Sequence, residues 1–503
     1  MVKTNSLIIL TIILTSSTLP YLMYVDIQAH VEENLLSSLH DQLPNQLGTA
    51  TIILQDQERN PLSAPFRISA SSLDFMLGAG VWTTTAITSW TTSDWDYYRN
   101  ASFEYEQIWT TWRLIQPTPN QFDYSSIQGQ IDYVKSHNPN AKFFARLQGI
   151  VPDPLVGNSL NDSTPPEFTN FTASTPPDFT TYLSQVSRYV LTLVSKYKGQ
   201  IDVWVTPIEI NRIDYATSAF NLPTSPWTLQ EAVEIDRIVA AAIKEANPNA
   251  IIVLGTSTPL SPYEGSSENR VDPITFEKMA IAGGVRFDDV AIEVYAFNGD
   301  VSFWYRYLNE MSNLGKTIFI NEAGASSDQF DYAKLEPGRE AQGAWCTALL
   351  TLSLSMHSIA GFFFLEFKDR IVQARYSQFE TMGLIDANGE PKPSYGGIQQ
   401  ILQGLTEYNG TTMLNGHVTV RLLPGNYTFQ ADGRKGELRI VEGTNLTYSV
   451  RVGNETELQF TTSASAPTIA TGRVENDPLL GDGDPNHVWN VLALRWPHDN
   501  RWS

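Results

Sequence analysis

Eight short apolar runs, alternating with segments of helical periodicity, constrain the fold of this chain more than any other feature. In chain order the runs are LDFMLGAGVW (from Leu73), QIWTTWRLI (Gln107), AKFFARLQ (Ala141), IDVWVTPIE (Ile201), AIIVLGTS (Ala250), DVAIEVYAF (Asp289), KTIFINE (Lys316) and AGFFFLEF (Ala360). Continuously apolar strands that alternate with helices are typical of a parallel sheet covered on both faces. Eight of them predict an α/β fold, a closed (β/α)8 TIM barrel over residues 76–405. No glycine-rich dinucleotide motif follows the first run, which argues against an open dinucleotide-binding sheet.

The segments on either side of the predicted barrel have a different character. Residues 46–75 read as an N-terminal β-hairpin, and residues 410–463 alternate with period two between Gly-Asn and Asp-Gly turns. The second segment therefore predicts a small, sandwich-like antiparallel β-module at the C-terminal side of the barrel. Residues 464–503 are rich in Pro, Gly and Asp and indicate a linker or a disordered tail.

The chain begins with a short basic stretch and an apolar run, Leu7 to Leu14, which favours a secretory signal over residues 1–29. An uncleaved membrane anchor over this segment stays open, since Ala29 gives only a weak cleavage site. Seven N-x-S/T sequons fit a secreted or extracellular glycoprotein. The single cysteine, Cys346, excludes an internal disulfide.

The net charge argues against two classes of partner. With 33 basic and 54 acidic residues the chain carries a formal charge of -21. Nucleic acids and anionic membrane surfaces both attract basic patches, so we expect no nucleic-acid partner and contact with a membrane only through an uncleaved anchor. The sequence does not indicate an oligomeric state.

Two glutamates end predicted strands, where a carboxylate is costly unless it has a partner or a task. Glu209 ends the fourth run and Glu322 ends the seventh. In a barrel of this type the catalytic groups lie at the C-terminal ends of the strands, so the two carboxyls should face each other across one mouth. Such a pair can cleave a glycosidic bond, one carboxyl as acid and the other as nucleophile.

At these residues the chain resembles the clan A glycoside hydrolases, and within that clan the family-10 xylanases. WVTPIE (Trp204 to Glu209) is similar to the Trp-Asp-Val-Val-Asn-Glu block of that family, and TWRLIQPTPNQFDY to its Lys-Trp…Glu-Pro…Gly-x-Phe block. The resemblance covers roughly residues 49–405. It implies a retaining endo-β-1,4-glycanase acting on xylan or another β-glycan, with Glu209 as acid/base and Glu322 as nucleophile.

Several positions depart from the xylanase pattern. Ile208 stands where the family has an asparagine that contacts the substrate, Thr111 where it has a sugar-binding lysine, and Leu365 where a strand-eight tryptophan is usual. These departures leave an alternative open, in which a catalytically altered barrel serves as a carbohydrate-binding or cell-surface protein. Retention of both glutamates favours the enzyme.

Further residues are candidates for substrate binding. Asn211, two positions after Glu209, could replace the lost amide. The resemblance implies that a sixth-strand group holds the nucleophile, which makes Tyr295 a candidate, with a core tyrosine as the alternative. Arg146 on the third strand could support a carboxylate or a sugar, or form a structural ion pair.

Around the nucleophile and the first strands we expect further sugar contacts. Asn321 adjoins Glu322, and the small residue Gly324 would leave room for a sugar ring. Sugars stack on flat aromatic faces, and Trp112 is our candidate among the tryptophans near predicted strand ends. The other tryptophans of this kind are Trp82, Trp109 and Trp304.

Rival chemistries have little support. The seven histidines are scattered and none ends a predicted barrel strand, so the sequence predicts neither a zinc site nor a Ser-His-Asp triad. No phosphate-binding loop is present. We therefore expect no metal and no cofactor, and a polysaccharide or oligosaccharide as the substrate.

Overall fold

The computed structural model describes residues 43, 46–80, 90–118, 120–150, 178–213, 227–260, 266, 269–328, 338–370, 377–452 and 458–465. The predicted signal or anchor, Trp82 and nearly all of the predicted tail lie outside these residues. Within them, no helix is both long enough and apolar enough to cross a membrane.

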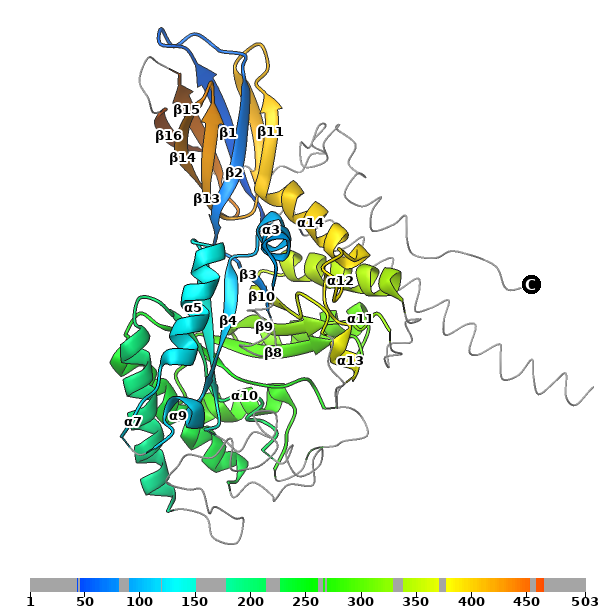
Figure 1. The fold of residues 1–503 in the computed structure, drawn as a ribbon. Coiled ribbons are helices and arrows are strands. Elements are labelled where there is room, and N and C mark those ends of the chain that lie inside the picture. Colours follow the sequence, from blue (N-terminus) through cyan, green and yellow to red (C-terminus); the bar gives the residue numbers. More distant parts are fainter. Residues whose placement is uncertain are drawn as a thin grey trace, which may run out of the picture.

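Eight parallel strands close into a barrel, which confirms the predicted fold class (Figure 1). Each of the eight apolar runs supplies one strand. The strands are β3 (Met76–Gly80), β4 (Tyr105–Thr111), β5 (Lys142–Gln148), β6 (Val203–Val205), β7 (Ile251–Leu254), β8 (Asp289–Tyr295), β9 (Thr317–Gly324) and β10 (Ile359–Leu365). The ring closes where β10 pairs with β3. These strands are almost entirely buried, because helices cover the outer face of the barrel and side chains fill its interior.

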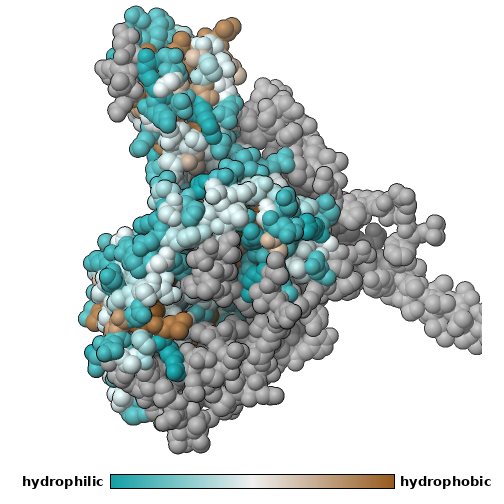
Figure 2. All heavy atoms as spheres, viewed as in Figure 1, coloured by the Kyte–Doolittle hydropathy of each residue, from teal (hydrophilic) through white to brown (hydrophobic). Residues whose placement is uncertain are grey.

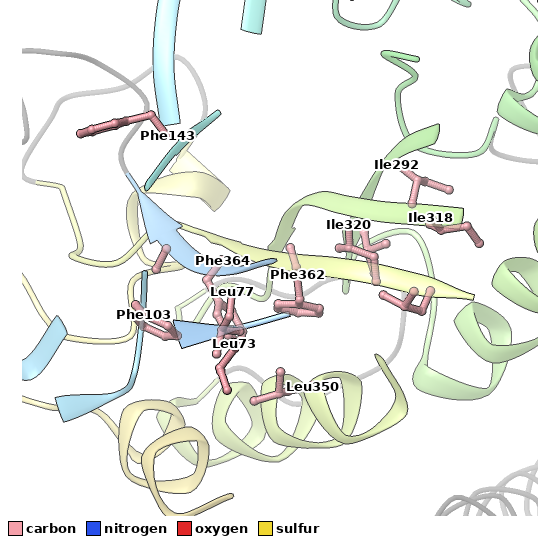
Figure 3. Packing of buried hydrophobic residues seen from close by; sticks show 14 of the residues in the cluster. Leu73, Leu77, Phe103, Phe143, Ile292, Ile318, Ile320, Leu350, Phe362 and Phe364 are labelled. Atoms are coloured by element: carbon pink, nitrogen blue, oxygen red, sulfur yellow. The ribbon is translucent and has the colours of Figure 1, made fainter. Parts of the chain in front are cut away.

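Helices alternate with the strands and surround the barrel. They are α3 (Thr92–Asn100), α4 (Trp112–Ile115), α5 (Ser125–His137), α7 (Phe179–Tyr197), α9 (Leu229–Ala246), α10 (Pro273–Ala282), α11 (Val301–Ser312), α12 (Arg339–Ser355), α13 (Ser377–Glu380) and α14 (Pro393–Thr406). The sequence marks where some of them begin: α9 starts with a capping box between Thr228 and Glu231. Outward-facing strand residues pack against the helices, as Leu77 and Phe362 do near Leu350 of α12 (Figure 3).

The barrel interior is closed by an apolar plug. Its buried members are Met76, Phe144, Val203, Val205, Ile208, Val253, Ala291, Phe319 and Phe363. The ring of Phe144 lies 4.8 Å from that of Phe363, and a Cβ on Gly80 would meet the Phe363 ring at 2.6 Å. Large rings and glycines therefore complement each other across the interior, as expected for a packed core rather than a pore.

A β-module of two four-stranded sheets lies at one end of the molecule (Figure 1). Its strands are β1 (Gly48–Gln55), β2 (Pro65–Leu73), β11 (Glu407–Thr411), β12 (His417–Leu422), β13 (Gly425–Ala431), β14 (Arg434–Ile440), β15 (Asn445–Arg451) and β16 (Gln459–Ser465). One sheet has the order β12-β1-β15-β16 and the other β11-β2-β13-β14.

The prediction of a separate N-terminal hairpin is wrong. β1 pairs with β12 and β15, whereas β2 pairs with β11 and β13 in the other sheet. The apolar side chains of β1 and β2 need partners that only the C-terminal strands provide: the Phe66 ring stacks on Phe429 at 5.4 Å. Both ends of the barrel segment therefore enter one module, which is larger than the predicted module of residues 410–463.

On the face that Figure 2 shows, the described residues are mostly hydrophilic, with small apolar patches. Three of the sequons, at Asn100, Asn409 and Asn426, lie at exposed positions, and Asn445 is half-buried. The sequons at Asn161, Asn170 and Asn454 lie outside the described residues.

Candidate active site

Glu322 lies near the C-terminal end of β9, and both of its carboxylate oxygens have a partner. The hydroxyl of Tyr295, on β8, donates to Oε2, and the guanidinium of Arg146, on β5, donates to Oε1. All three residues are at most 4% exposed. A carboxylate that receives two donors from different strands is fixed in position, and both donors favour its ionised form.

Arg146 connects two carboxylates. Besides Glu322 it contacts Glu293 on β8, with Nη2 3.3 Å from Oε1. One face of its guanidinium lies over the Trp109 ring, 5.0 Å from the centroid. This stacking adds a cation–π attraction and leaves the edge of the guanidinium for the two acids.

Glu293 and Glu322 are level with each other because β8 and β9 pair in that register. Glu293 is 3% exposed. Burial raises the pKa of Glu293 well above its usual value, the nearby Glu209 carboxyl raises it further, and Arg146 opposes both effects.

Glu209 follows β6 in a tight turn and is partly exposed at the same mouth of the barrel. Its φ angle is 52°, in the left-handed region that glutamate rarely adopts. The backbone N–H of Arg212 donates to the Glu209 carbonyl at 2.8 Å and closes the turn. A non-glycine residue held in this conformation costs about 1 kcal/mol or more, and such strain clusters at functional sites.

Aromatic rings form one wall of the mouth. The ring of Phe297 stacks on Tyr295 at 4.8 Å, and Phe379 meets both rings edge-on. Tyr295 is thereby held with its hydroxyl toward Glu322.

Two residues that we predicted to bind substrate, Asn211 and Trp112, are buried in the core instead. Asn211 is fully buried, with its amide donating to the Val271 carbonyl at 2.8 Å and accepting from the Ser257 N–H at 2.9 Å. Trp112 is 1% exposed and stacks on Tyr189 at 4.8 Å. The apolar run that we predicted as one strand breaks after Thr111 into helix α4, which turns Trp112 into the core.

The surroundings of Glu322 also differ from expectation. Gly324 is small because β10 lies against it: a Cβ there would meet the Leu365 carbonyl oxygen at 2.5 Å. Asn321 is 1% exposed, and its Oδ1 atom accepts no hydrogen bond from the described residues. Of the predicted site residues, Glu209, Glu322, Tyr295 and Arg146 come together at the mouth.

The roles of Glu293 and Trp109 were not predicted. For Glu293 a signal existed, since it lies two positions before Tyr295 on the same face of a strand. Its partners come from three other strands or turns, however, and only the barrel brings them together. Within the described residues, no group of three or more His, Cys, Asp or Glu side chains is arranged to hold a metal ion.

No protein-family model matches the sequence, and no curated protein matches it. Solved structures similar to it include a GH10 protein from Paenibacillus barcinonensis, 16% identical, with 65% of this chain and 94% of that chain covered and a TM-score of 0.46. Native xylanase 10B from Thermotoga maritima is 16% identical, with 66% and 95% covered and a TM-score of 0.48. A GH5_18 protein from Bifidobacterium longum subsp. infantis is 13% identical, with 65% and 79% covered and a TM-score of 0.49.

Proposed function

We propose that this protein is a retaining glycoside hydrolase that cleaves the β-linked bonds of a polysaccharide or oligosaccharide, xylan or another β-1,4-glycan. The observation that carries the proposal is the pair of carboxyls at one barrel mouth, in two different environments. Glu322 is buried and accepts from Arg146 and Tyr295, whereas Glu209 lies at the partly exposed edge of the mouth, in the turn after β6. Two acids whose surroundings differ in this way suit an ionised nucleophile and a proton donor.

In the first step Glu322 attacks the anomeric carbon, and Glu209 protonates the leaving oxygen as the glycosidic bond breaks. In the second step Glu209 takes a proton from water, whose oxygen displaces Glu322 from the sugar. Retention requires carboxyls about 5 to 5.5 Å apart, and inversion about 6.5 to 9.5 Å. Arg146 and Tyr295 stabilise the charge on Glu322 when it leaves in the second step.

The roles are tested by two substitutions and one control. Glu322→Ala should abolish turnover, and azide should restore it with inverted product, because the small anion occupies the space of the lost carboxylate. Glu209→Ala should spare substrates with activated leaving groups, which need no proton in the first step. Glu277→Gln, which removes a buried carboxyl on α10 away from the mouth, should leave turnover unchanged.

The assignment fails if the wild type gives an inverted product. It also fails if Glu209→Ala loses activity equally on activated and unactivated substrates while remaining folded.

A second candidate function is carbohydrate binding without turnover, favoured by Ile208, Thr111 and Leu365 at positions where the xylanases bind sugar. Thr111 donates to Gln148 at 3.3 Å, so its hydroxyl is engaged within the barrel. Calorimetric titration with oligosaccharides separates the two functions. Binding with no product after long incubation would favour the binding protein, and product formation would exclude it.

We also propose that the chain is exported and glycosylated. The exposed sequons at Asn100, Asn409 and Asn426 support this, as does the N-terminal apolar run. Cell fractionation and treatment with an N-glycosidase would test it: an unshifted band from a purely intracellular protein would contradict the proposal.

A further inference from the structure

Arg146 is a buried cation held between two carboxyls, and the proposed reaction removes the charge of one of them. Its guanidinium donates to Glu322 through Nη1 and contacts Oε1 of Glu293 through Nη2 at 3.3 Å. Arg146 is 1% exposed and Glu293 is 3% exposed. Among the described residues, these two acids are the ones that pair with Arg146. The proposed nucleophile therefore shares its cation with an acid that the two-step scheme does not use.

We propose that Glu293 is a positioning residue that holds Arg146 at Glu322 and remains its anionic partner while Glu322 is bound to the sugar. The inference rests on the proposed function and deepens it, because it assigns a task to a carboxyl outside the nucleophile and acid/base pair. The strand register supports it: Glu293 on β8 lies level with Glu322 on β9, so the edge of one guanidinium reaches both. The Trp109 ring covers a face of that guanidinium and leaves its edge to the two acids.

The first step of the reaction changes the charges around Arg146. An oxygen of ionised Glu322 forms a bond to the anomeric carbon, the glycosidic carbon–oxygen bond breaks, and the leaving oxygen takes the proton of Glu209. Glu322 is then a neutral ester, whereas Arg146 is still a cation, because a guanidinium does not lose its proton in proteins. A buried cation without an anionic partner is costly. Glu293 supplies that anion in the glycosyl-enzyme.

The surroundings of Glu293 make its charge depend on this cation. Burial raises the pKa of Glu293, and the nearby Glu209 carboxyl raises it further. Arg146 and Arg212 act in the opposite direction. While Glu322 is ionised it competes with Glu293 for Arg146. Once Glu322 is an ester, Arg146 acts on Glu293 alone, which favours the ionised form of Glu293.

Glu293→Gln tests the proposal when the two steps are measured separately. Glutamine keeps the shape and an acceptor for Arg146 but carries no charge. The probes are dinitrophenyl β-glycosides of xylobiose and cellobiose in which fluorine replaces the hydroxyl next to the anomeric carbon. Their activated leaving group lets the glycosyl-enzyme form, and the fluorine slows its hydrolysis. Intact-mass spectrometry follows the gain of the label, which reports the first step, and its loss, which reports the second.

In Glu293→Gln the gain of the label should slow by about tenfold or more, because the glycosyl-enzyme then holds a buried cation without its anion. The loss of the label should not slow, because the whole charge of Arg146 then stabilises the departing Glu322 carboxylate. A purely structural defect would slow both steps. Slowing of both steps, or an unchanged gain of the label, would therefore overturn the proposal.

Two further variants separate charge from shape. Glu293→Asp keeps the charge with one methylene less and should gain the label faster than Glu293→Gln. A folded Glu293→Asp variant that gains it no faster would overturn the proposal. Glu277→Gln is the matched control, since it neutralises a buried carboxyl outside the mouth and should leave both rates unchanged.

Urea denaturation distinguishes a failure of this inference from a failure of the proposed function. If the wild type cleaves no glycan and gains no label, the proposed function fails. A double-mutant cycle of Glu293→Gln and Arg146→Met then still decides whether Glu293 acts through Arg146. The shift in the urea midpoint of the double variant should be smaller than the sum of the two single shifts. Additive shifts would overturn the inference whatever the activity.

Discussion

Substitution of Arg146 by methionine should destabilise the fold strongly and in a pH-dependent manner. Methionine retains much of the side-chain volume but removes the positive charge that contacts Glu293 and Glu322. At 3.3 Å and an effective dielectric of about 20, one such contact corresponds to about 5 kcal/mol of attraction. Removing one partner of a buried ion pair costs about 3 to 5 kcal/mol. We expect the free energy of unfolding of Arg146→Met to fall by this amount near neutral pH.

The loss should shrink as the pH falls. The folded state of the wild type already raises the pKa of Glu293 through burial, and Arg146 opposes that effect. Without Arg146 the folded-state pKa of Glu293 rises further, so the folded variant binds a proton more tightly than the unfolded chain does. A group of this kind destabilises above its unfolded pKa, and the penalty disappears as the pH falls toward that value.

Urea denaturation followed by tryptophan fluorescence, repeated over a series of pH values, measures both effects. The double variant Arg146→Met/Glu293→Gln should regain part of the loss, because it removes one of the two stranded charges. Arg237→Met is the matched control: this exposed arginine pairs with Glu234 on the surface of α9 and should contribute about 1 kcal/mol or less. A loss below about 1 kcal/mol for Arg146→Met, or a loss that does not change with pH, would refute the electrostatic account.

Three further predictions address other parts of the fold. The free energy of unfolding of Glu209→Gly should exceed that of Glu209→Ala by about 1 kcal/mol, because only glycine adopts a positive φ without strain. Glu209→Gly should therefore unfold at a higher urea concentration. Asn211→Ala should lower stability by about 2 kcal/mol or more, measured by the same denaturation, because Ser257 N–H and the Val271 carbonyl lose their buried partner. Burial raises the pKa of Glu277 to about 7, so stability should decline between about pH 4.5 and 7 through this group, and Glu277→Gln should flatten that part of the curve. Denaturation profiles that do not change in these variants would contradict each expectation in turn.

The barrel could be predicted from the sequence, and so could the common location of four candidate residues at one mouth, because both depend on local patterns. Parallel strands buried on both faces are continuously apolar, and a charged residue at the end of such a run stands out. Glu209 and Glu322 stand out in this way, whereas Arg146 lies inside its apolar run and Tyr295 became a candidate through the resemblance to the clan A glycoside hydrolases. Their common location then follows from the fold, since the C-terminal ends of parallel strands lie at one mouth.

The remaining features depend on partners that are distant in the sequence. β1 and β2 look like a hairpin because they are adjacent in the sequence. However, β1 pairs with β12, and the partners Gly48 and Leu422 are about 370 positions apart in the chain. The breaking of the apolar run at Thr111 depends on the stacking of Trp112 on Tyr189 of a later helix. Neither interaction leaves a signal in the local pattern.

The apolar plug beneath the mouth explains why each buried carboxylate of the site lies next to a cation or a hydrogen-bond donor. Phe144 and Phe363 close the barrel below Arg146, so water can reach the buried carboxyls only from the open side. In such surroundings each carboxylate needs a cation, a hydrogen bond or a proton. Arg146 forms ion pairs with Glu293 and Glu322, and the hydroxyl of Tyr295 donates a second hydrogen bond to Glu322. The third carboxyl, that of Glu209, lies at the partly exposed edge of the mouth, where water can solvate it.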